Sequence, residues 1–273
     1  MTITGYGICT WTLGDLPLQD IAARVAALGY DGVELLGEIE KHTAAEAKRI
    51  LDDHGLAVFS LTPIDVDLAH PDERAHRAAL DYYLSLLDFA VGLSAPLISC
   101  HGAVGRIRPI TTWQQEWTLM VEGVRVIAER AQKLGLRVAL ELLNRYESHL
   151  LTSVEQGLRF LGEVGSPNLG LHLDAYHMNI EEPNPAGAVR AAGRGLFLFH
   201  VADSNREAVG RGHTDFAALL RALDEIAYTG PIIVECAAPG PDPFRAIKDE
   251  SSVRWVETYA RESLAKLGAL IKS

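Results

Sequence analysis

The chain contains few cysteines, no long apolar run and no excess of positive charge. Its three cysteines, Cys9, Cys100 and Cys236, are far apart and form no Cys-x-x-Cys motif, which argues against a disulfide framework or a thiolate zinc site. No apolar stretch approaches the ~20 residues that a membrane span needs. The formal net charge of −11 disfavours binding to a phosphate backbone. Neither a nucleic acid nor a membrane is therefore expected as a partner.

The N-terminal segment lacks the features of a secretion signal. Its first residues, Met-Thr-Ile-Thr-Gly-Tyr, contain no basic region followed by an apolar segment, so we expect a cytoplasmic protein. With 273 residues, 48% of them hydrophobic, the chain is long enough for one large α/β domain or two small ones.

Strand-like and helix-like patterns alternate along the whole chain, with glycine or a short polar turn between them. Candidate strands start near residues 3, 31, 56, 97, 137, 169, 196 and 231, and the longest candidate helix spans about 73 to 93. We predict an α/β protein that forms a single (β/α)₈ TIM barrel over residues 1–273. The rival is a doubly wound open sheet, which commonly has a glycine-rich phosphate turn after its first strand. The segment Cys9-Thr-Trp-Thr-Leu13 is not such a turn.

Four acid or imidazole side chains each stand at the end of a predicted strand. They are Glu141, Asp174, His200 and Glu235, spaced about one βα unit apart. The carboxyl ends of the strands form the active-site face of such a barrel. Three carboxylates and one imidazole suit Mn²⁺, Co²⁺ or Mg²⁺ better than a thiolate-seeking ion. The sequence therefore predicts a site for a divalent cation, and the alternative is a set of salt-bridge partners or helix caps.

Glu141 and Glu235 also suggest acid/base chemistry. They end the fifth and eighth predicted strands, which are three positions apart around a ring of eight. The two carboxylates would then approach a bound substrate from different sides. Such a pair permits removal of a proton on one face of the substrate and return of a proton on the other.

Aromatic and imidazole side chains are candidates for the walls of a substrate pocket. Trp11 and Trp113 could form a wall of such a pocket, whereas Trp117 on a helix is more typical of core or interface packing. His101, at the end of the fourth predicted strand, could line the pocket or cap backbone groups.

Two further polar residues lie on predicted strands close to this end of the barrel. Glu34 on the second strand could face the pocket or serve an ordinary turn. His172 shares strand parity with Asp174, and we predict a hydrogen-bonded core histidine rather than a fifth ligand.

Four segments of the chain resemble a known family in order and spacing. They are Glu141-Leu-Leu-Asn-Arg-Tyr-Glu147, Leu173-Asp-Ala-Tyr-His-Met-Asn-Ile-Glu-Glu182, His200 through Arg206 together with Gly210-x-Gly212, and Tyr228-Thr-Gly230 to Glu235. Over residues 137 to 236 the chain is similar to the xylose-isomerase-like TIM barrel superfamily and, within it, to the ketose 3-epimerases typified by D-tagatose and D-psicose 3-epimerases.

The resemblance implies a function and a role for each matching residue. The implied function is C3 epimerisation of a ketose, in which a proton leaves and returns through a metal-bound cis-enediolate. The implied ligands of Mn²⁺, with Co²⁺ or Mg²⁺ as alternatives, are Glu141, Asp174, His200 and Glu235, of which Glu141 and Glu235 would also be the acid/base pair. The implied contacts of the sugar oxygens are Glu147, His177 and Arg206. A small-molecule sugar or sugar derivative is the expected partner, and relatives are commonly dimers or tetramers.

The chain departs from the family pattern at several positions. Gly7 stands where an aromatic residue is usual, and Ala237-Ala238 stand where a proline and an aromatic residue are common. We expect these changes to widen the pocket, which could then admit a larger sugar or a glycoside. The main alternative function is a metal-dependent lyase that acts on 3-keto glycosides by β-elimination. Further alternatives are a hydroxypyruvate- or inositol-pathway isomerase or dehydratase, and a non-catalytic subunit.

Overall fold

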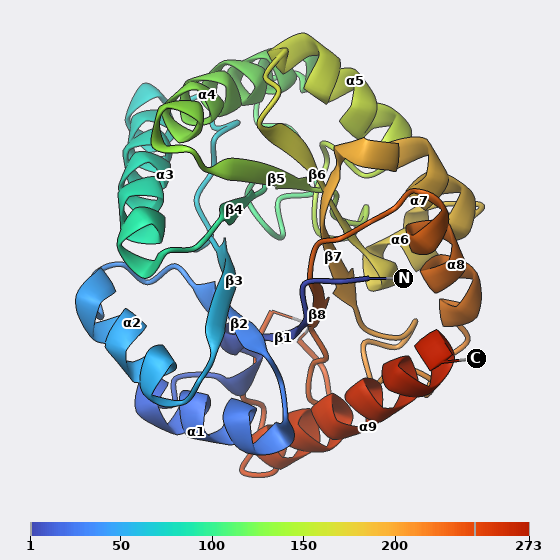
Figure 1. The fold of residues 1–273 in the computed structure, drawn as a ribbon. Helices are drawn as coiled ribbons and strands as arrows, with labels where there is room; N and C mark the ends of the chain where they lie inside the picture. Colours follow the sequence, from blue (N-terminus) through green and yellow to red (C-terminus); the bar gives the residue numbers. More distant parts are fainter. Residues whose placement is uncertain (1, 243, 273) are drawn as a thin grey trace.

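Eight parallel strands alternate with helices to form a (β/α)₈ barrel (Figure 1) in the computed structural model, which describes residues 2–242 and 244–272. The strands are β1 Tyr6–Cys9, β2 Gly32–Leu36, β3 Ala57–Thr62, β4 Leu97–Cys100, β5 Arg137–Glu141, β6 Leu169–Asp174, β7 Leu196–Val201 and β8 Ile232–Val234. The α-helices are α1 Leu18–Leu28, α2 Ala44–Asp53, α3 Glu73–Leu93, α4 Trp113–Leu134, α5 Val154–Val164, α6 Ala175–Glu181, α7 Pro185–Ala192, α8 Phe216–Glu225 and α9 Ser252–Lys272. Two short 3₁₀ helices span Thr10–Leu13 and Gly193–Gly195. None of the helices in the described part of the chain is long and apolar enough to span a membrane.

The strands follow one another around the barrel in chain order. The hydrogen-bonded order is β3-β2-β1-β8-β7-β6-β5-β4, and β3 and β4, at the two ends of this order, lie in contact and close the ring. The ladder is thus continuous from β4 through β8 to β3, with a seam where β3 meets β4. The helices form an outer layer around the strands (Figure 1).

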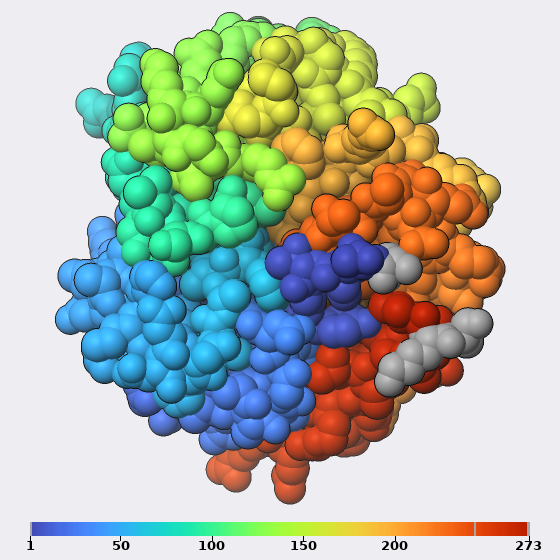
Figure 2. Space-filling view, viewed as in Figure 1, coloured from blue at the N-terminus to red at the C-terminus, as the bar shows by residue number. Residues whose placement is uncertain are grey.

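The end of the barrel where the strands begin is covered by the N-terminal segment. In Figure 2 this segment, dark blue, lies across the centre of the face. The hydroxyl of Thr4 donates to the carbonyl oxygen of Thr229 at 2.7 Å, which ties the segment to the loop before β8. Any pocket reached from solvent is therefore expected at the opposite end, where the strands finish.

Apolar side chains fill the inside of the barrel below that opposite end. A small cluster contains Cys9, Phe59, Leu97, Ala139, Leu198 and Ile233. Alternation along a strand places Ala139 on the same face as Glu141, and Ile233 on the same face as Glu235. The polar residues thus rest on an apolar floor, and a second, larger cluster packs the helices against the outside of the strands.

Gly7 does not open the pocket, contrary to the expectation from the sequence. A Cβ atom at this position would lie 2.6 Å from Cδ1 of Ile233 and 3.0 Å from Cδ2 of Phe59. The side chains of Ile233 and Phe59 therefore occupy the space that a larger residue would fill. Ala237 and Ala238 are buried and do not line the pocket either.

The strands begin close to their expected positions, but one helix was not anticipated. The first strand starts at Tyr6 rather than near residue 3, and the others start within one residue of the expectation. Helix α6 follows β6 without a loop, and the side chain of Asp174 caps it by accepting a hydrogen bond from the N–H of Tyr176 at 2.9 Å. This helix places His177 above the end of the barrel.

A buried ionic cluster holds the loop between β4 and α4. The carboxylate of Glu116 pairs with Arg106 and accepts hydrogen bonds from the N–H groups of Ile110 at 2.6 Å and Thr111 at 2.8 Å. Arg106 also bonds Asp67, with 2.8 Å between Nε and Oδ2. Burial would raise the pKa of Glu116, but the hydrogen bonds from Arg106 and the backbone lower it to about 2.

Replacement of Glu116 by glutamine is expected to lower the free energy of unfolding at pH 7 by about 3 kcal/mol, because the folded pKa of about 2 lies well below the free value of 4.5. This stabilisation is present above the free pKa and is lost as the pH falls towards 2. Urea denaturation of Glu116→Gln would measure it, and Glu122→Gln, an exposed position on the same helix, is the control. Equal midpoints for the two variants would contradict the expectation.

Candidate active site

Glu141, Asp174, His200 and Glu235 lie together where β5, β6, β7 and β8 end. Each offers a ligand atom, and the four atoms lie within 4.8 Å of one another. Strand pairing places them, because Asp174 stands opposite His200 and the N–H of Glu235 donates to the carbonyl oxygen of Val201 at 3.0 Å. The sequence expectation that these residues converge is met.

The donor atoms of this cluster fit a metal ion. Oδ2 of Asp174 and Nδ1 of His200 are buried and have no hydrogen-bond partner. Buried polar atoms without a partner are rare in folded proteins. A divalent cation between these two atoms would satisfy both, and it would be held by oxygen and imidazole nitrogen, as Mn²⁺ and related ions prefer.

Negative charge dominates the buried site. Among the described residues, the site contains five buried carboxylates against the charges of Arg206 and His200; the carboxylates belong to Glu34, Glu141, Glu147, Asp174 and Glu235. Burial and the neighbouring Glu235 raise the pKa of Glu141 well above its ordinary value and raise the pKa of Asp174 to about 6. Burial would raise the pKa of Glu235 as well, but the charges of His200 and Arg206 hold it well below its usual range. A divalent cation would replace the protons that these groups otherwise retain.

Glu34 sits behind His200 and fixes the orientation of its ring. The Glu34 carboxylate lies 3.1 Å from Nε2 of His200 and accepts hydrogen bonds from the hydroxyls of Ser60 and Thr62. With Nε2–H directed at Glu34, the other ring nitrogen, Nδ1, faces the ligand cluster. A carboxylate behind a metal-binding histidine is the usual way to hold such a ring. The alternative that Glu34 serves a turn is wrong.

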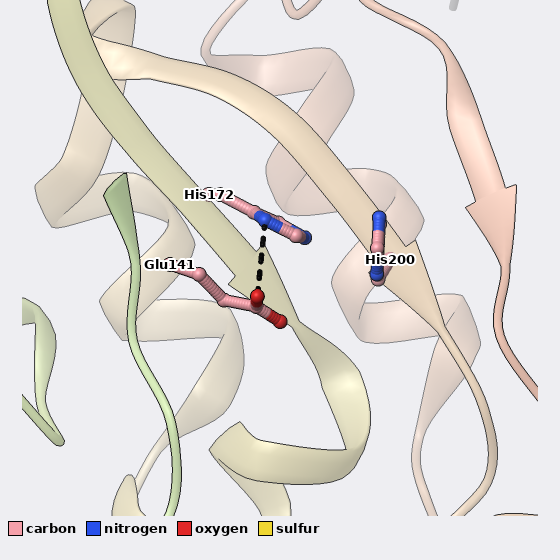
Figure 3. Close-up of side chains that lie close together, drawn as sticks. All are labelled: Glu141, His172 and His200. Carbon is pink, nitrogen blue, oxygen red and sulfur yellow. Dashed lines mark ion pairs between the residues drawn. The ribbon is translucent and has the colours of Figure 1, made fainter. Parts of the chain in front are cut away.

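His172 lies beside the ligand cluster, between β5 and β7 (Figure 3). Its Nδ1 is 2.9 Å from the hydroxyl of Ser99 and 3.7 Å from Oε2 of Glu141, and its ring meets the ring of His200 edge-on with 3.9 Å between centroids. Burial and the charge of His200 hold the pKa of His172 well below its usual range. The residue is a buried, hydrogen-bonded histidine, as expected. Ligand atoms of Glu141, His172 and His200 also lie within 4.8 Å of one another.

The tautomer of His177 is set by Asn144. Nδ1 of His177 lies 2.8 Å from the Nδ2 amide of Asn144 and 3.3 Å from its backbone N–H, so it accepts from both. The ring proton therefore resides on Nε2, which faces Oδ2 of Asp174 at 3.7 Å and Oε1 of Glu141 at 3.9 Å. Burial and the charge of Arg206 hold the pKa of His177 well below its usual range. His177 is thus a neutral hydrogen-bond donor aimed at the cluster.

Asn144 was not singled out from the sequence. Its Nδ2 amide also lies 2.8 Å from Oε1 of Glu147, so it positions two pocket side chains at once. In the sequence, Asn144 is marked only by its position between Glu141 and Glu147. An asparagine between two acidic residues is too common to identify a positioning residue.

Arg206 reaches the cluster from the loop after β7. Asp203 organises this loop by accepting hydrogen bonds from the N–H groups of Ser204 at 2.7 Å and Gly210 at 2.7 Å. The backbone of Arg206 adopts a left-handed conformation, with φ of 62°. Its Nη2 donates to Oε2 of Glu235 at 2.9 Å, and its guanidinium carbon lies 4.5 Å from the ring centre of Tyr176.

A pocket of about 410 Å³ opens above the cluster. It is lined by Trp11, Leu36, Thr62, Pro63, Ile64, Asp65, His101, Val104, Glu141, Leu143, Glu147, His177, Arg206, Glu235 and Phe244. Five expected substrate contacts, Trp11, His101, Glu147, His177 and Arg206, thus share one pocket. Nε1 of Trp11 donates to Oε1 of Glu235 at 2.7 Å, so the indole contacts an expected acid/base group directly.

Trp113 does not line this pocket, which corrects the expectation from the sequence. It is the first residue of α4, in the outer layer of helices. Its ring stacks on Trp117 with 4.7 Å between centroids, and the guanidinium of Arg159 lies 5.9 Å from its ring centre. Trp117 itself is buried in the core, as predicted.

Comparison with known proteins reveals similarity along most of the chain. The sequence profile of the xylose isomerase-like TIM barrel family matches residues 22–261. An L-ribulose 3-epimerase from Methylomonas sp. is 33% identical over 223 residues, which cover 78% of this chain and 76% of the relative. A 3-dehydro-D-guloside 4-epimerase from Escherichia coli is 28% identical over 242 residues, which cover 86% of this chain and 92% of the relative. A crystal structure of a D-psicose 3-epimerase in the presence of D-fructose matches with a TM-score of 0.88 and 25% identity, covering 99% of this chain and all of that one.

Proposed function

Since the chain belongs to the xylose isomerase-like TIM barrel family and to the ketose 3-epimerases within it, we propose that it inverts C3 of a free ketose in a reaction that depends on a divalent metal ion. The observation that carries this proposal is the pair of buried carboxylates, Glu141 and Glu235, which end β5 and β8 and contribute to a single ligand cluster. A substrate held between them can lose a proton to one carboxylate and gain one from the other.

The metal ion would be held by Glu141, Asp174, His200 and Glu235, and Mn²⁺ suits this oxygen-rich set best. When bound, it would supply positive charge that polarises the substrate carbonyl and acidifies the neighbouring C3–H bond. Two donor atoms of this set, Oδ2 of Asp174 and Nδ1 of His200, have no hydrogen-bond partner, which supports the assignment.

The protein's own groups account for the remaining steps. Glu141 or Glu235 takes the C3 proton, the electron pair forms a cis-enediolate, and the opposite carboxylate returns a proton to the other face of C3. The carboxylates exchange roles in the reverse direction. Nε2–H of His177 and the guanidinium of Arg206 donate to oxygen atoms at which negative charge develops, which is where preorganised donors accelerate a reaction most.

The test is incubation of manganese-loaded protein in D₂O with D-psicose and D-fructose, followed by NMR. We expect deuterium at C3 of both sugars and conversion of each into the other, because the returned proton comes from solvent-exchanged carboxylates. The proposal would be contradicted if neither deuterium exchange nor conversion occurred with these sugars or with other free ketoses. Heat-treated protein loaded with the same metal is the control.

A second candidate substrate is a glycoside with a ketone at C3. It is favoured by the Escherichia coli relative, a 3-dehydro-D-guloside 4-epimerase; the match to this chain covers 92% of that relative. The same carboxylate pair would act on the carbon next to that ketone. Return of the proton would give an epimer, whereas loss of a leaving group would give an unsaturated product and a lyase. Methyl 3-keto-β-D-glucopyranoside in the same D₂O experiment separates these outcomes.

We further propose that the protein works in the cytoplasm as a homo-oligomer. Its three cysteines, Cys9, Cys100 and Cys236, are free and buried, as is usual in a reducing compartment. The family resemblance implies a dimer or a tetramer, and light scattering of the purified protein would test the oligomeric state.

Replacement of Glu34 by glutamine is expected to weaken Mn²⁺ binding by about 10- to 100-fold, because partners behind a metal-binding histidine typically contribute that much. An amide nitrogen can also turn towards Nε2 of His200 and release the ring from its present orientation. Calorimetric titration of metal-free protein with Mn²⁺ would measure the change. Glu147→Gln is the matched control, since Glu147 lines the pocket but does not contact His200. Unchanged Mn²⁺ affinity in Glu34→Gln would contradict the expected role.

A further inference from the structure

The far side of the pocket is formed by the two loops that flank the seam. Asp65 lies in the loop after β3, and His101 and Val104 lie in the loop after β4. Because Cys100 pairs with Leu140, His101 stands beside Glu141 at the end of the neighbouring strand. The wall of the pocket beside Glu141 therefore continues past His101 towards Asp65.

His101 presents a hydrogen-bond acceptor to this part of the pocket. Its Nδ1 lies 2.6 Å from the carbonyl oxygen of Gly102. A carbonyl oxygen can only accept, so the proton of the ring resides on Nδ1 and the lone pair on Nε2. Burial lowers the pKa of His101, which keeps the ring neutral and Nε2 free to accept.

Asp65 presents a second acceptor closer to solvent. Its Oδ1 accepts a hydrogen bond from the N–H of Val104 at 2.9 Å. Among the described residues, Oδ2 has no hydrogen-bond partner, so it is available to a ligand. The bond to Val104 and the bond from Arg106 to Asp67 both join the two loops across the seam, and they hold Asp65 in place before a ligand arrives.

Positive charge is absent from this side of the pocket. Of the described residues that line the pocket, Arg206 is the one with a permanent positive charge, and its guanidinium is paired with Glu235 at the opposite side, where the expected metal ligands lie. Arg106, two residues beyond Val104, is occupied by Asp67 and Glu116. The two acceptors, on His101 and Asp65, can bind hydroxyl groups, which donate hydrogen bonds. They cannot bind a phosphate, which needs hydrogen-bond donors or positive charge.

We propose that His101 and Asp65 select the substrate by accepting hydrogen bonds from the hydroxyls of the ketose carbons beyond C3. The preferred substrate is then a neutral ketose with a terminal hydroxyl, and its 6-deoxy and 6-phosphate forms are discriminated against. This inference rests on the proposed function, because that function places C3 between Glu141 and Glu235 and thereby directs the rest of the sugar towards Asp65.

Three probes test the proposal on manganese-loaded protein: D-psicose, 6-deoxy-D-psicose and D-psicose 6-phosphate. We expect kcat/KM for D-psicose to exceed the value for the 6-deoxy sugar by about 10-fold, because the 6-deoxy sugar cannot donate to the carboxylate and a hydrogen bond to a charged group typically contributes about that factor. The value for the 6-phosphate should be lower still, because the carboxylate of Asp65 repels the phosphate.

Asp65→Asn is the informative variant, because asparagine can keep the oxygen that bonds Val104 while it replaces the second acceptor with a donor. We expect it to lower kcat/KM for D-psicose by about 10-fold. The fold loss in kcat/KM for 6-deoxy-D-psicose should be at least about fivefold smaller. The kcat/KM for the 6-phosphate, relative to that for D-psicose, should rise. Asp81→Asn, at an exposed position on α3, is the matched control.

His101→Phe keeps a planar ring but removes the acceptor. It should lower kcat/KM for D-psicose and for the 6-deoxy sugar alike, because the hydroxyls nearest C3 are present in both. Asp65→Asn and His101→Phe thus have different signatures, which a general loss of structure would not reproduce. Equal losses on both sugars in Asp65→Asn, or equal use of both sugars by the unmodified protein, would overturn the proposal.

Binding measurements separate this inference from the proposed function. If the unmodified protein turns over neither these sugars nor other free ketoses, the epimerase proposal fails. Calorimetric titration with D-psicose and its 6-deoxy form then still reports whether Asp65→Asn weakens binding of the first more than that of the second. No detectable binding of D-psicose would overturn both proposals.

Discussion

Replacement of Glu141 or Glu235 by glutamine is expected to lower the turnover of the ketose by about 100-fold or more, in line with the usual contribution of a general acid or base. Glutamine preserves the volume of the side chain and one oxygen that can bind a metal ion, but it cannot take up the C3 proton. Steady-state turnover at saturating D-psicose is the measurement, and the metal content of each variant should be determined alongside it.

The two variants should also differ from each other in D₂O. If each carboxylate serves one face of C3, Glu141→Gln should still exchange the C3 proton of one epimer, and Glu235→Gln that of the other. Turnover within about threefold of the unmodified protein, in a variant with normal metal content, would remove that glutamate from the mechanism. Glu155→Gln, an exposed position on α5, is the control for handling and stability.

Removal of divalent metal is expected to abolish turnover, and Mn²⁺ or Co²⁺ should restore it. The reason is the buried cluster itself, in which three carboxylates and His200 converge on one point and two polar atoms have no partner. Dialysis against a chelator, followed by titration with Mn²⁺, Co²⁺, Mg²⁺ and Ca²⁺, is the measurement. Full activity of the metal-free protein would contradict the expected dependence.

Two further readouts accompany metal removal. Added Mn²⁺ should raise the thermal midpoint of the metal-free protein, since a ligand that binds only the folded state stabilises it by mass action. Affinity for Mn²⁺ should fall as the pH is lowered from about 8 to 6. The sign follows from the raised pKa values of Glu141 and Asp174, the latter about 6, because these carboxyl groups bind protons that the metal ion must displace.

The barrel and the ligand cluster could be predicted because both depend on local patterns that repeat. Each strand is a short apolar run, and each ligand residue stands where such a run ends. In parallel strands these ends meet on one face, so the convergence of Glu141, Asp174, His200 and Glu235 follows from the fold. Their place in the ladders could be inferred without any knowledge of the loops.

Other features depended on contacts that the sequence pattern does not record. Glu34 turns towards His200 where the register between β2 and β3 shifts at Val33 and Glu34, and such an irregularity has no signature in the residues. Helix α6 is only seven residues long, and its cap, Asp174, is also an expected metal ligand. Trp113 was assigned to the pocket because aromatic residues often line sugar sites, although its position on α4 faces Trp117 instead.

The width of the pocket was misjudged for a similar reason. Gly7, Ala237 and Ala238 lack the larger side chains that are usual in the family, but the sequence does not reveal which neighbouring side chains fill the space. Phe59 and Ile233 fill the position beside Gly7. Asp65, in turn, could not be distinguished from an ordinary solvated acid, because its neighbours Val104 and His101 are more than thirty residues away along the chain.

The seam between β3 and β4 divides the mouth of the barrel into two parts that respond differently to sequence change. The expected metal ligands stand at the ends of β5 to β8, which pair with one another in order, with one register shift between β6 and β7, so a change in any of these strands disturbs the spacing of the others. The loops after β3 and β4 stand over the one boundary in the ring that has no ladder. Under the proposed function, insertions or exchanges in these loops are therefore expected to alter which sugars are accepted while the chemistry stays intact. Libraries aimed at new ketoses should be concentrated at residues 63–66 and 101–105.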